Sequence, residues 1–186
     1  KFKTADGTEL NGWMMKPLLL QNAEMAVISG GKTFPVLMFV YGGPGSNTVN
    51  DTWDRDYFWY QMLCTKGYII VSVDNRGTGG RGKKFRTCTY KQLGKLETED
   101  QIEAAKYLGT LPYVDKNRIG IWGWSYGGYM SSLCIMKGAD ASTELSTGVF
   151  KMAMAVAPVT NWRYYDNIYT ERYMGLPTPP TRYPKG

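Results

Sequence analysis

The segment that most constrains this chain is a serine framed by glycines, between an apolar run and a stretch of small residues. Ser125 lies in a Gly-x-Ser-x-Gly pattern with Gly123 and Gly127, directly after the apolar run 119–122. That run predicts a buried strand, and residues 126–137 are rich in small and apolar side chains and predict a helix. Small residues two positions away on each side leave room for a sharp turn. The pattern therefore predicts a strand–turn–helix unit that pushes the Ser125 hydroxyl into a cleft.

A serine in that position is a candidate nucleophile, and the N–H of the next residue, Tyr126, is a candidate donor to a developing oxyanion. A serine hydroxyl is a weak nucleophile until a neighbouring base accepts its proton. The 186-residue sequence contains no histidine, and its only aspartates after Ser125 are Asp140 and Asp166. We therefore expect a nucleophile without its base, so that this chain alone is inactive.

Apolar runs alternate with segments of helical character along the chain. The runs that predict buried strands are residues 36–41, 68–73, 119–122 and 150–156. Continuous apolar strands are typical of parallel sheets that are covered on both faces. Residues 53–66 and 98–108 predict helices between the strands. This alternation predicts the α/β class, with a doubly wound, mostly parallel sheet in a single domain.

The N-terminal 15 residues predict a different pairing. The short apolar-rich runs 2–5 and 10–15 flank an Asp-Gly pair at positions 6 and 7. Asp-Gly favours the tight turn of a β-hairpin. We therefore expect the chain to open with an antiparallel strand pair within residues 1–15.

Charge and cysteine content bear on possible partners. The net charge is +6, but the basic residues are dispersed along the sequence. Their densest cluster is interpreted as a solvated loop and consists of Arg81, Lys83, Lys84 and Arg86. No nucleic-acid partner is therefore expected. The three cysteines lack metal-ligand spacing, so no metal and no organic cofactor are expected. Cys64 and Cys134 lie in apolar surroundings, which predicts inert core thiols.

A second oxyanion donor is expected from the loop after an earlier strand. Residues 41–45, Tyr-Gly-Gly-Pro-Gly, follow the first buried run, and glycines let a backbone approach a ligand closely. Tyr41 could contribute its phenol instead of an amide. Alternatively, Tyr41 is simply the last residue of a buried strand, and the residues alone leave these possibilities open.

Several blocks of the sequence carry a family resemblance. They are residues 120–129 with a tryptophan directly before the serine, 40–44, 73–79, 93–101, 157–166 and 169–175. Together they resemble the prolyl oligopeptidase superfamily of serine peptidases, most closely its dipeptidyl peptidase IV branch. The block at 157–175 is the most specific, because an unrelated esterase has no reason to share it.

The resemblance implies a role for particular residues. Ser125 matches the family's nucleophile, and Tyr41 matches the tyrosine whose hydroxyl, with the Tyr126 amide, forms the oxyanion hole. The apolar pocket for a proline side chain is matched by Val159, Trp162, Tyr165 and Tyr169. Stacked aromatic faces suit a compact, rigid proline ring, and such a pocket tolerates alanine. Without the resemblance, these aromatic residues would be assigned to the core.

The resemblance also implies what the chain lacks. We expect residues 1–186 to form a partial peptidase domain of the α/β-hydrolase fold, incomplete at its C-terminal end. We expect the upstream β-propeller, and the later segment that carries the triad aspartate and histidine, to be absent from these 186 residues. The parent protein is expected to form homodimers and to act outside the cytoplasm.

The expected activity of the parent is release of Xaa-Pro or Xaa-Ala dipeptides from peptide N-termini, through an acyl-enzyme on Ser125. Its partners are then peptides with proline or alanine in second position. Two alternatives are a non-catalytic fragment or interaction module, and another α/β-hydrolase such as an acylaminoacyl peptidase or an esterase. The missing histidine favours the former for the isolated chain.

Overall fold

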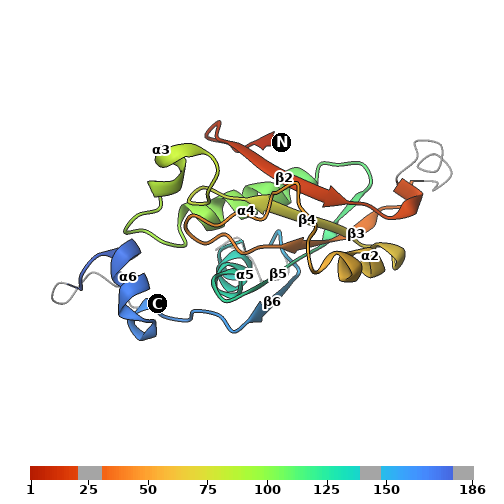
Figure 1. Cartoon of the computed structure of the whole chain (residues 1–186). Helices are drawn as coiled ribbons and strands as arrows, with labels where there is room; N and C mark the ends of the chain where they lie inside the picture. The colour runs from red at the N-terminus through yellow and green to blue at the C-terminus, as the bar shows by residue number, and fades with distance from the viewer. Residues whose placement is uncertain (21–30, 139–147, 178–186) are drawn as a thin grey trace.

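A six-stranded sheet forms the centre of the molecule, in a computed structural model that describes residues 1–20, 31–138 and 148–177 (Figure 1). The strand order is β1-β2-β4-β3-β5-β6. The strands are β1 (Phe2–Lys3), β2 (Glu9–Met15), β3 (Phe34–Phe39), β4 (Ile69–Asp74), β5 (Val114–Trp124) and β6 (Met152–Val156). The helices are α2 (Tyr57–Thr65), α3 (Gly82–Thr87), α4 (Leu96–Leu108), α5 (Tyr126–Lys137) and α6 (Asn167–Met174).

Four neighbouring strands run parallel, and the N-terminal pair is antiparallel. β3 pairs in parallel with β4 and with β5, and β5 pairs in parallel with β6. β2 runs antiparallel to β4, and the hairpin partner β1 pairs with it through Phe2 opposite Leu10. The predicted sheet class and the predicted N-terminal strand pair are both confirmed.

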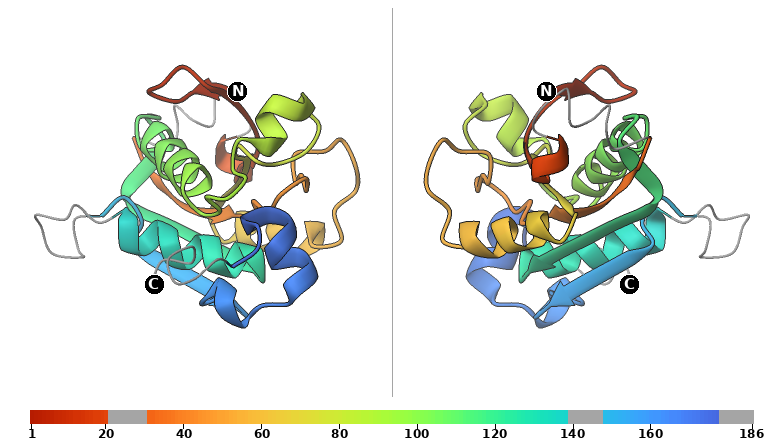
Figure 2. Two further views of the ribbon diagram at one scale, coloured as in Figure 1. Left: turned by 90° about the vertical axis from the view of Figure 1, so that its left-hand side faces the viewer. Right: turned by 90° about the vertical axis from the view of Figure 1, so that its right-hand side faces the viewer.

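Helices cover both faces of the sheet, which explains why its strands read as continuous apolar runs. On one face, Val36 and Met38 of β3 belong to the large core that also contains residues of α4 and α5. On the other face, Leu37 packs with Tyr60 and Cys64 of α2. The strands lie between α2 and the pair α4 and α5 (Figure 2). This arrangement confirms the doubly wound organisation and the buried thiols of Cys64 and Cys134.

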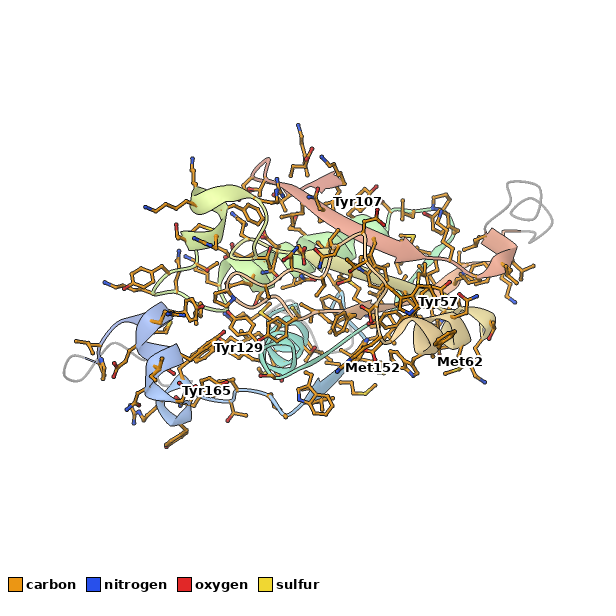
Figure 3. The ribbon with its side chains drawn as sticks, viewed as in Figure 1. Tyr57, Met62, Tyr107, Tyr129, Met152 and Tyr165 are labelled. Atoms are coloured by element: carbon orange, nitrogen blue, oxygen red, sulfur yellow. The ribbon has the colours of Figure 1, made fainter. Side chains whose placement is uncertain are left out.

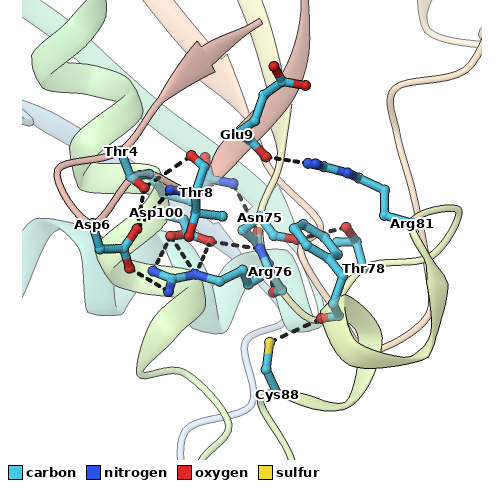
Figure 4. A network of polar contacts seen from close by, with 12 residues as sticks. Thr4, Asp6, Thr8, Glu9, Asn75, Arg76, Thr78, Arg81, Cys88 and Asp100 are labelled. Carbon is cyan, nitrogen blue, oxygen red and sulfur yellow. Dashed lines mark hydrogen bonds and ion pairs between the residues drawn. The ribbon is translucent and has the colours of Figure 1, made fainter.

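The turn of the N-terminal hairpin is tied to the loop that follows β4. Arg76 contacts Asp100 through two guanidinium nitrogens and reaches Asp6, in the hairpin turn, at 2.8 Å (Figure 4). Asp100 is fully buried, and its burial raises its pKa while the Arg76 guanidinium opposes that rise. This network fixes the start of the glycine-rich loop after β4, which approaches the candidate site.

The basic cluster at 81–86 forms a helix, where the sequence predicted a loop. α3 begins at Gly82, whose φ is +84°, and the Arg81 guanidinium lies 4.4 Å from the centre of the Phe85 ring. The Gly77 amide donates to the Phe85 carbonyl at 3.0 Å. These tertiary contacts stabilise a six-residue helix that has no apolar periodicity of its own. Within the described ranges, no helix combines the length and the apolar character needed to cross a bilayer.

Candidate active site

Ser125 sits between the end of β5 and the start of α5, in a backbone conformation that serine rarely adopts. Its φ is 58° and its ψ is −112°. A positive φ for a residue with a Cβ persists only where surrounding contacts hold it. The Ser125 amide donates to the Val156 carbonyl at 2.9 Å, and its carbonyl accepts from the Tyr129 amide at 3.0 Å. The end of β6 and the first turn of α5 therefore fix the serine in this conformation.

Glycines around the serine allow the chain to pass very close to neighbouring backbone. A Cβ placed on Gly123 or on Gly127 would lie 2.1 Å from the Val40 carbonyl oxygen. A Cβ on Gly128 would lie 2.7 Å from the Val156 carbonyl oxygen. Backbone atoms cannot yield to such contacts without shifting the strands. The glycines thus bring α5 against the ends of β3 and β6.

The side chain of Tyr126 is buried in the interior, and its amide is the first N–H of α5. Its hydroxyl donates to Glu97 Oε1 at 2.7 Å, and the Gly94 amide donates to Glu97 Oε2 at 3.0 Å. Glu97 is fully buried, and burial raises its pKa to about 7. The Tyr126 amide belongs to the first helical turn, where N–H groups have no acceptor within the helix. A donor is therefore held directly after the serine.

β3 ends at Phe39, so Tyr41 lies two residues beyond it, in the loop that follows the strand. It is therefore not the last residue of the strand, as one interpretation of the sequence held. Its half-buried ring lies 6.2 Å from that of Tyr126. Burial, together with the neighbouring Tyr165 and Tyr173, raises the pKa of Tyr41. The phenol consequently keeps its proton at neutral pH and can donate a hydrogen bond.

Side chains from the next loop and from α4 hold the backbone that carries Tyr41. Asn75 Nδ2 donates to the Gly42 carbonyl at 3.0 Å, and Gln101 Nε2 donates to Asn75 Oδ1 at 2.9 Å. Gly42 has a φ of +74°, and a Cβ there would lie 2.6 Å from Asn75 Oδ1. Sequence reasoning missed Asn75, Gln101 and Glu97. The sequence does contain a signal for them: Asn75 directly follows a buried strand, and Glu97 and Gln101 are polar residues on the buried face of a helix.

The aromatic residues matched to the pocket form one cluster beside α5. Trp162 and Tyr169 stack at 5.9 Å with their planes 8° apart, and Tyr165 meets Tyr169 edge-on at 5.3 Å. The Trp162 ring also lies 5.8 Å from that of Tyr126. Tyr129 and Tyr165 lie at the end of the molecule where the parallel strands finish (Figure 3). The cluster therefore adjoins the helix that begins after Ser125.

Three further residues singled out from the sequence are Val159, Asp166 and Asp140. Val159 is partly buried and packs against the main core. Asp166 caps α6, since its Oδ1 accepts from the Tyr169 amide at 2.9 Å. Asp140 lies outside the described residues. No group of three metal-ligating side chains occurs within the described ranges.

The sheet, with helices on both faces and a serine at positive φ between β5 and α5, defines a domain of the α/β-hydrolase type. The sequence model of the prolyl oligopeptidase family matches residues 54–185, which is more than half of the chain. The chain therefore belongs to the prolyl oligopeptidase family, and the resemblance stated from its sequence is confirmed.

Individual relatives are dipeptidyl peptidases by name. The chain is 52% identical over 146 residues to a probable dipeptidyl-aminopeptidase B of Arthroderma gypseum, covering 78% of the chain but 15% of that protein. Its fold matches the crystal structure of Porphyromonas gingivalis dipeptidyl peptidase 4, with a TM-score of 0.80 and 46% identity over 93% of the chain and 22% of that protein. A putative dipeptidyl aminopeptidase IV from Bacteroides ovatus gives a TM-score of 0.79 and 37% identity, over 94% of the chain and 23% of that protein. The chain thus spans less than a quarter of each of these relatives.

Proposed function

We propose that the protein containing this chain is a serine-type dipeptidyl peptidase that releases Xaa-Pro or Xaa-Ala dipeptides from peptide N-termini. The observation that carries the proposal is Ser125 at a φ of 58°, held between Val156 and the first turn of α5. Family membership and relatives named dipeptidyl peptidases support the reaction class. The aromatic cluster supports the preference for proline.

The proposed reaction is acyl transfer. Ser125 Oγ attacks the carbonyl carbon of the scissile bond while a general base accepts its proton. The Tyr126 amide and the Tyr41 phenol donate hydrogen bonds to the oxyanion that forms. The C–N bond then breaks, and the leaving amine takes the proton from the base. Water hydrolyses the resulting ester by the same steps and frees Ser125.

The proposed substrate pocket consists of Trp162, Tyr165 and Tyr169, together with Val159. A proline ring is apolar and rigid, so it is bound by aromatic faces with little loss of conformational freedom. Alanine fits the same space with less contact, whereas a charged side chain would lose its hydration without a partner. This chemistry favours proline first and alanine second.

The general base is proposed to come from outside these 186 residues, because the sequence contains no histidine. The isolated chain is then a non-catalytic piece. Removing triad members leaves only the residual acceleration that an oxyanion hole and substrate binding supply. Steady turnover by the isolated chain, sensitive to a serine-directed reagent, would overturn this part of the proposal.

The test combines covalent labelling with a substrate panel on the full-length protein. A fluorophosphonate should label Ser125, and Ser125→Ala should remove both the label and the activity. The control Ser132→Ala deletes a hydroxyl on the same helix, one that donates to the Gly128 carbonyl, and should leave both intact. Ala-Pro-aminomethylcoumarin should be cleaved, and its N-acetylated form should not. Preference for the acetylated substrate or for simple esters would instead indicate an acylaminoacyl peptidase or an esterase.

A further inference from the structure

A cavity lies away from Ser125, on the face of the sheet that α2 covers. Its volume is about 540 Å³, and it is a half-open cavity lined by residues of β2, of the loop after β3 and of the first turns of α2. Cavities of a few hundred cubic ångströms are typical of small-molecule sites. Tyr57, which lines this cavity, lies on α2, well apart from Tyr129 and Tyr165 (Figure 3). The proposed peptidase chemistry makes no use of this cavity.

The charged groups on its wall are acidic. Asp51 and Asp54 line the cavity, and none of its lining residues is a lysine or an arginine. The nearby Arg55 contacts Asp56, at 3.7 Å. In the parts of the chain that the structure describes, neither Asp51 nor Asp54 forms an ion pair. Two carboxylates therefore face one cavity without a counter-charge, which favours a positively charged ligand.

Aromatic rings supply the rest of the recognition surface. Trp53 is 70% exposed and lies 4.4 Å from the ring of Tyr57. Trp13 also lines the cavity, and its position is fixed because its Nε1 donates to the Thr48 carbonyl at 3.0 Å. The faces of tryptophan and tyrosine attract ammonium and guanidinium groups, more strongly where water is excluded. Rings together with carboxylates are a better match to an organic cation than to a neutral ligand.

A buried hydroxyl on the cavity wall has no partner. Tyr60 is 1% exposed, lines the cavity, and its hydroxyl forms no hydrogen bond within the described residues. Burial raises the pKa of Tyr60, and so do the nearby Asp54 and Asp56, whereas the nearby Arg55 lowers it. A buried polar atom without a partner is costly. The Tyr60 hydroxyl is therefore a buried polar group on this wall whose hydrogen-bonding capacity is unused.

We propose that this cavity binds an organic cation, an alkylammonium or guanidinium group, between the carboxylates of Asp51 and Asp54 and the rings of Trp13, Trp53 and Tyr57. The group can belong to a free amine or to a lysine or arginine side chain of a peptide. A metal ion fits less well, because the described residues include no set of three metal-ligating side chains. The site is independent of Ser125 and of the proposed peptidase activity.

The test is calorimetric titration of the full-length protein, with Ser125→Ala as the background so that no probe is consumed. The probes are Nα-acetyl-lysine amide, n-butylammonium and the neutral isostere Nα-acetyl-norleucine amide. Both cations should bind at least about tenfold more tightly than norleucine amide, and more weakly as salt rises. Tighter binding of lysine amide than of butylammonium identifies a peptide side chain as the source, and equal binding identifies a free amine. Norleucine amide binding as tightly as lysine amide would overturn the proposal.

Variants locate the binding in this cavity. The double change Asp51→Asn and Asp54→Asn keeps the side-chain oxygen at position 54 that accepts from the Asp56 amide. It should lower the affinity for both cations about tenfold or more. Trp53→Leu should weaken them several-fold, and its exposed position leaves the core intact. Glu103→Gln removes one carboxylate charge from a partly exposed position on α4 that does not line the cavity, and as the control it should leave both affinities unchanged. Unchanged affinity in both the double variant and Trp53→Leu would overturn the assignment.

Discussion

Ser125 and Glu97 are each held in an intrinsically unfavourable state: a positive φ for Ser125 and a buried carboxyl group for Glu97. Ser125 keeps a positive φ through two backbone hydrogen bonds. Glu97 keeps a carboxylate in a fully buried position, where it accepts from Tyr126 and from the Gly94 amide. Unfavourable conformations and buried ionisable groups of this kind are common near functional sites. Both residues hold the turn from β5 into α5.

Glu97 should make the stability of the protein depend on pH. Its folded-state pKa of about 7 lies above the ordinary value of 4.5, so between these values the folded state binds a proton that the unfolded state does not. Stability from this group is therefore complete below about pH 4.5 and is lost as the pH rises through 7. The free energy of unfolding of Glu97→Gln, relative to wild type, should therefore rise by up to about 3 kcal/mol between pH 5 and pH 8.

Urea unfolding at several pH values measures this gain. The glutamine can accept from the Gly94 amide through its oxygen and donate to the Tyr126 hydroxyl through its nitrogen, so the local hydrogen bonds are retained. Glu103→Gln, on the exposed face of the same helix, is the control and should show no pH-dependent gain. Parallel pH profiles for wild type and Glu97→Gln would contradict the account.

At the scale of elements, close backbone contacts position α5 against the strand ends. Gly127, in the first turn of α5, has no room for a Cβ, which would lie 2.1 Å from the Val40 carbonyl oxygen. The same oxygen limits Gly123, in β5. The turn therefore depends on glycine at two positions for reasons of packing, separately from the chemistry of Ser125.

Gly127→Ala should destabilise the domain by about 2 kcal/mol or more, since a backbone atom must shift to admit the methyl group. It should also lower activity, because α5 carries the Tyr126 amide. The control is Gly109→Ala, where a Cβ meets nothing closer than 3.3 Å. Thermal unfolding and peptidase rates of both variants test this. An equal, small effect of the two substitutions would show that the close approach at Gly127 is unimportant.

The elements that the sequence predicted best are those with a strong local signal. The apolar runs gave β3, β4, β5 and β6 because each strand is covered on both faces, and Asp6-Gly7 gave the hairpin. α3 was predicted as a loop, since its six residues lack apolar periodicity and depend on contacts of Phe85 with Arg81 and Gly77. The start of α4 was placed two residues late, at 98 in place of Leu96, so Glu97 was not recognised.

Only part of the candidate site could be predicted from the sequence. Ser125, Tyr126 and Tyr41 stand next to glycines and strand ends, which are visible signals. From local pattern alone, Trp162, Tyr165 and Tyr169 would be assigned to the core, and only the family resemblance identified them as pocket residues. Asn75 and Gln101 act through contacts between segments 26 residues apart, which no local pattern can predict.

At the scale of the whole molecule, the sheet ends at β6 with an unpaired outer side in the described part of the chain. β6 pairs with β5 alone, and Met152 and Met154 are 46% and 45% exposed. An apolar edge strand is a template for pairing with another chain. The 186-residue chain on its own should therefore self-associate at micromolar concentrations.

Sedimentation of the isolated chain over a range of concentrations measures this. Met154→Lys should shift the chain toward monomer, because a charge on an edge strand opposes pairing. Met136→Lys places the same charge on the exposed end of α5, and as a control should leave association unchanged. A chain that stays monomeric at all concentrations would show that the β6 edge does not drive assembly.

Ser125 is proposed to be the nucleophile of a proline-directed dipeptidyl peptidase. The most direct test of this proposal is the rate of p-nitroaniline release from Gly-Pro-p-nitroanilide by the full-length protein and by its Ser125→Ala variant. We expect turnover by the wild type and a loss of rate of about 10⁴-fold or more in the variant. A variant that keeps a rate within tenfold of wild type, or a wild type that leaves the substrate intact, would contradict the proposal.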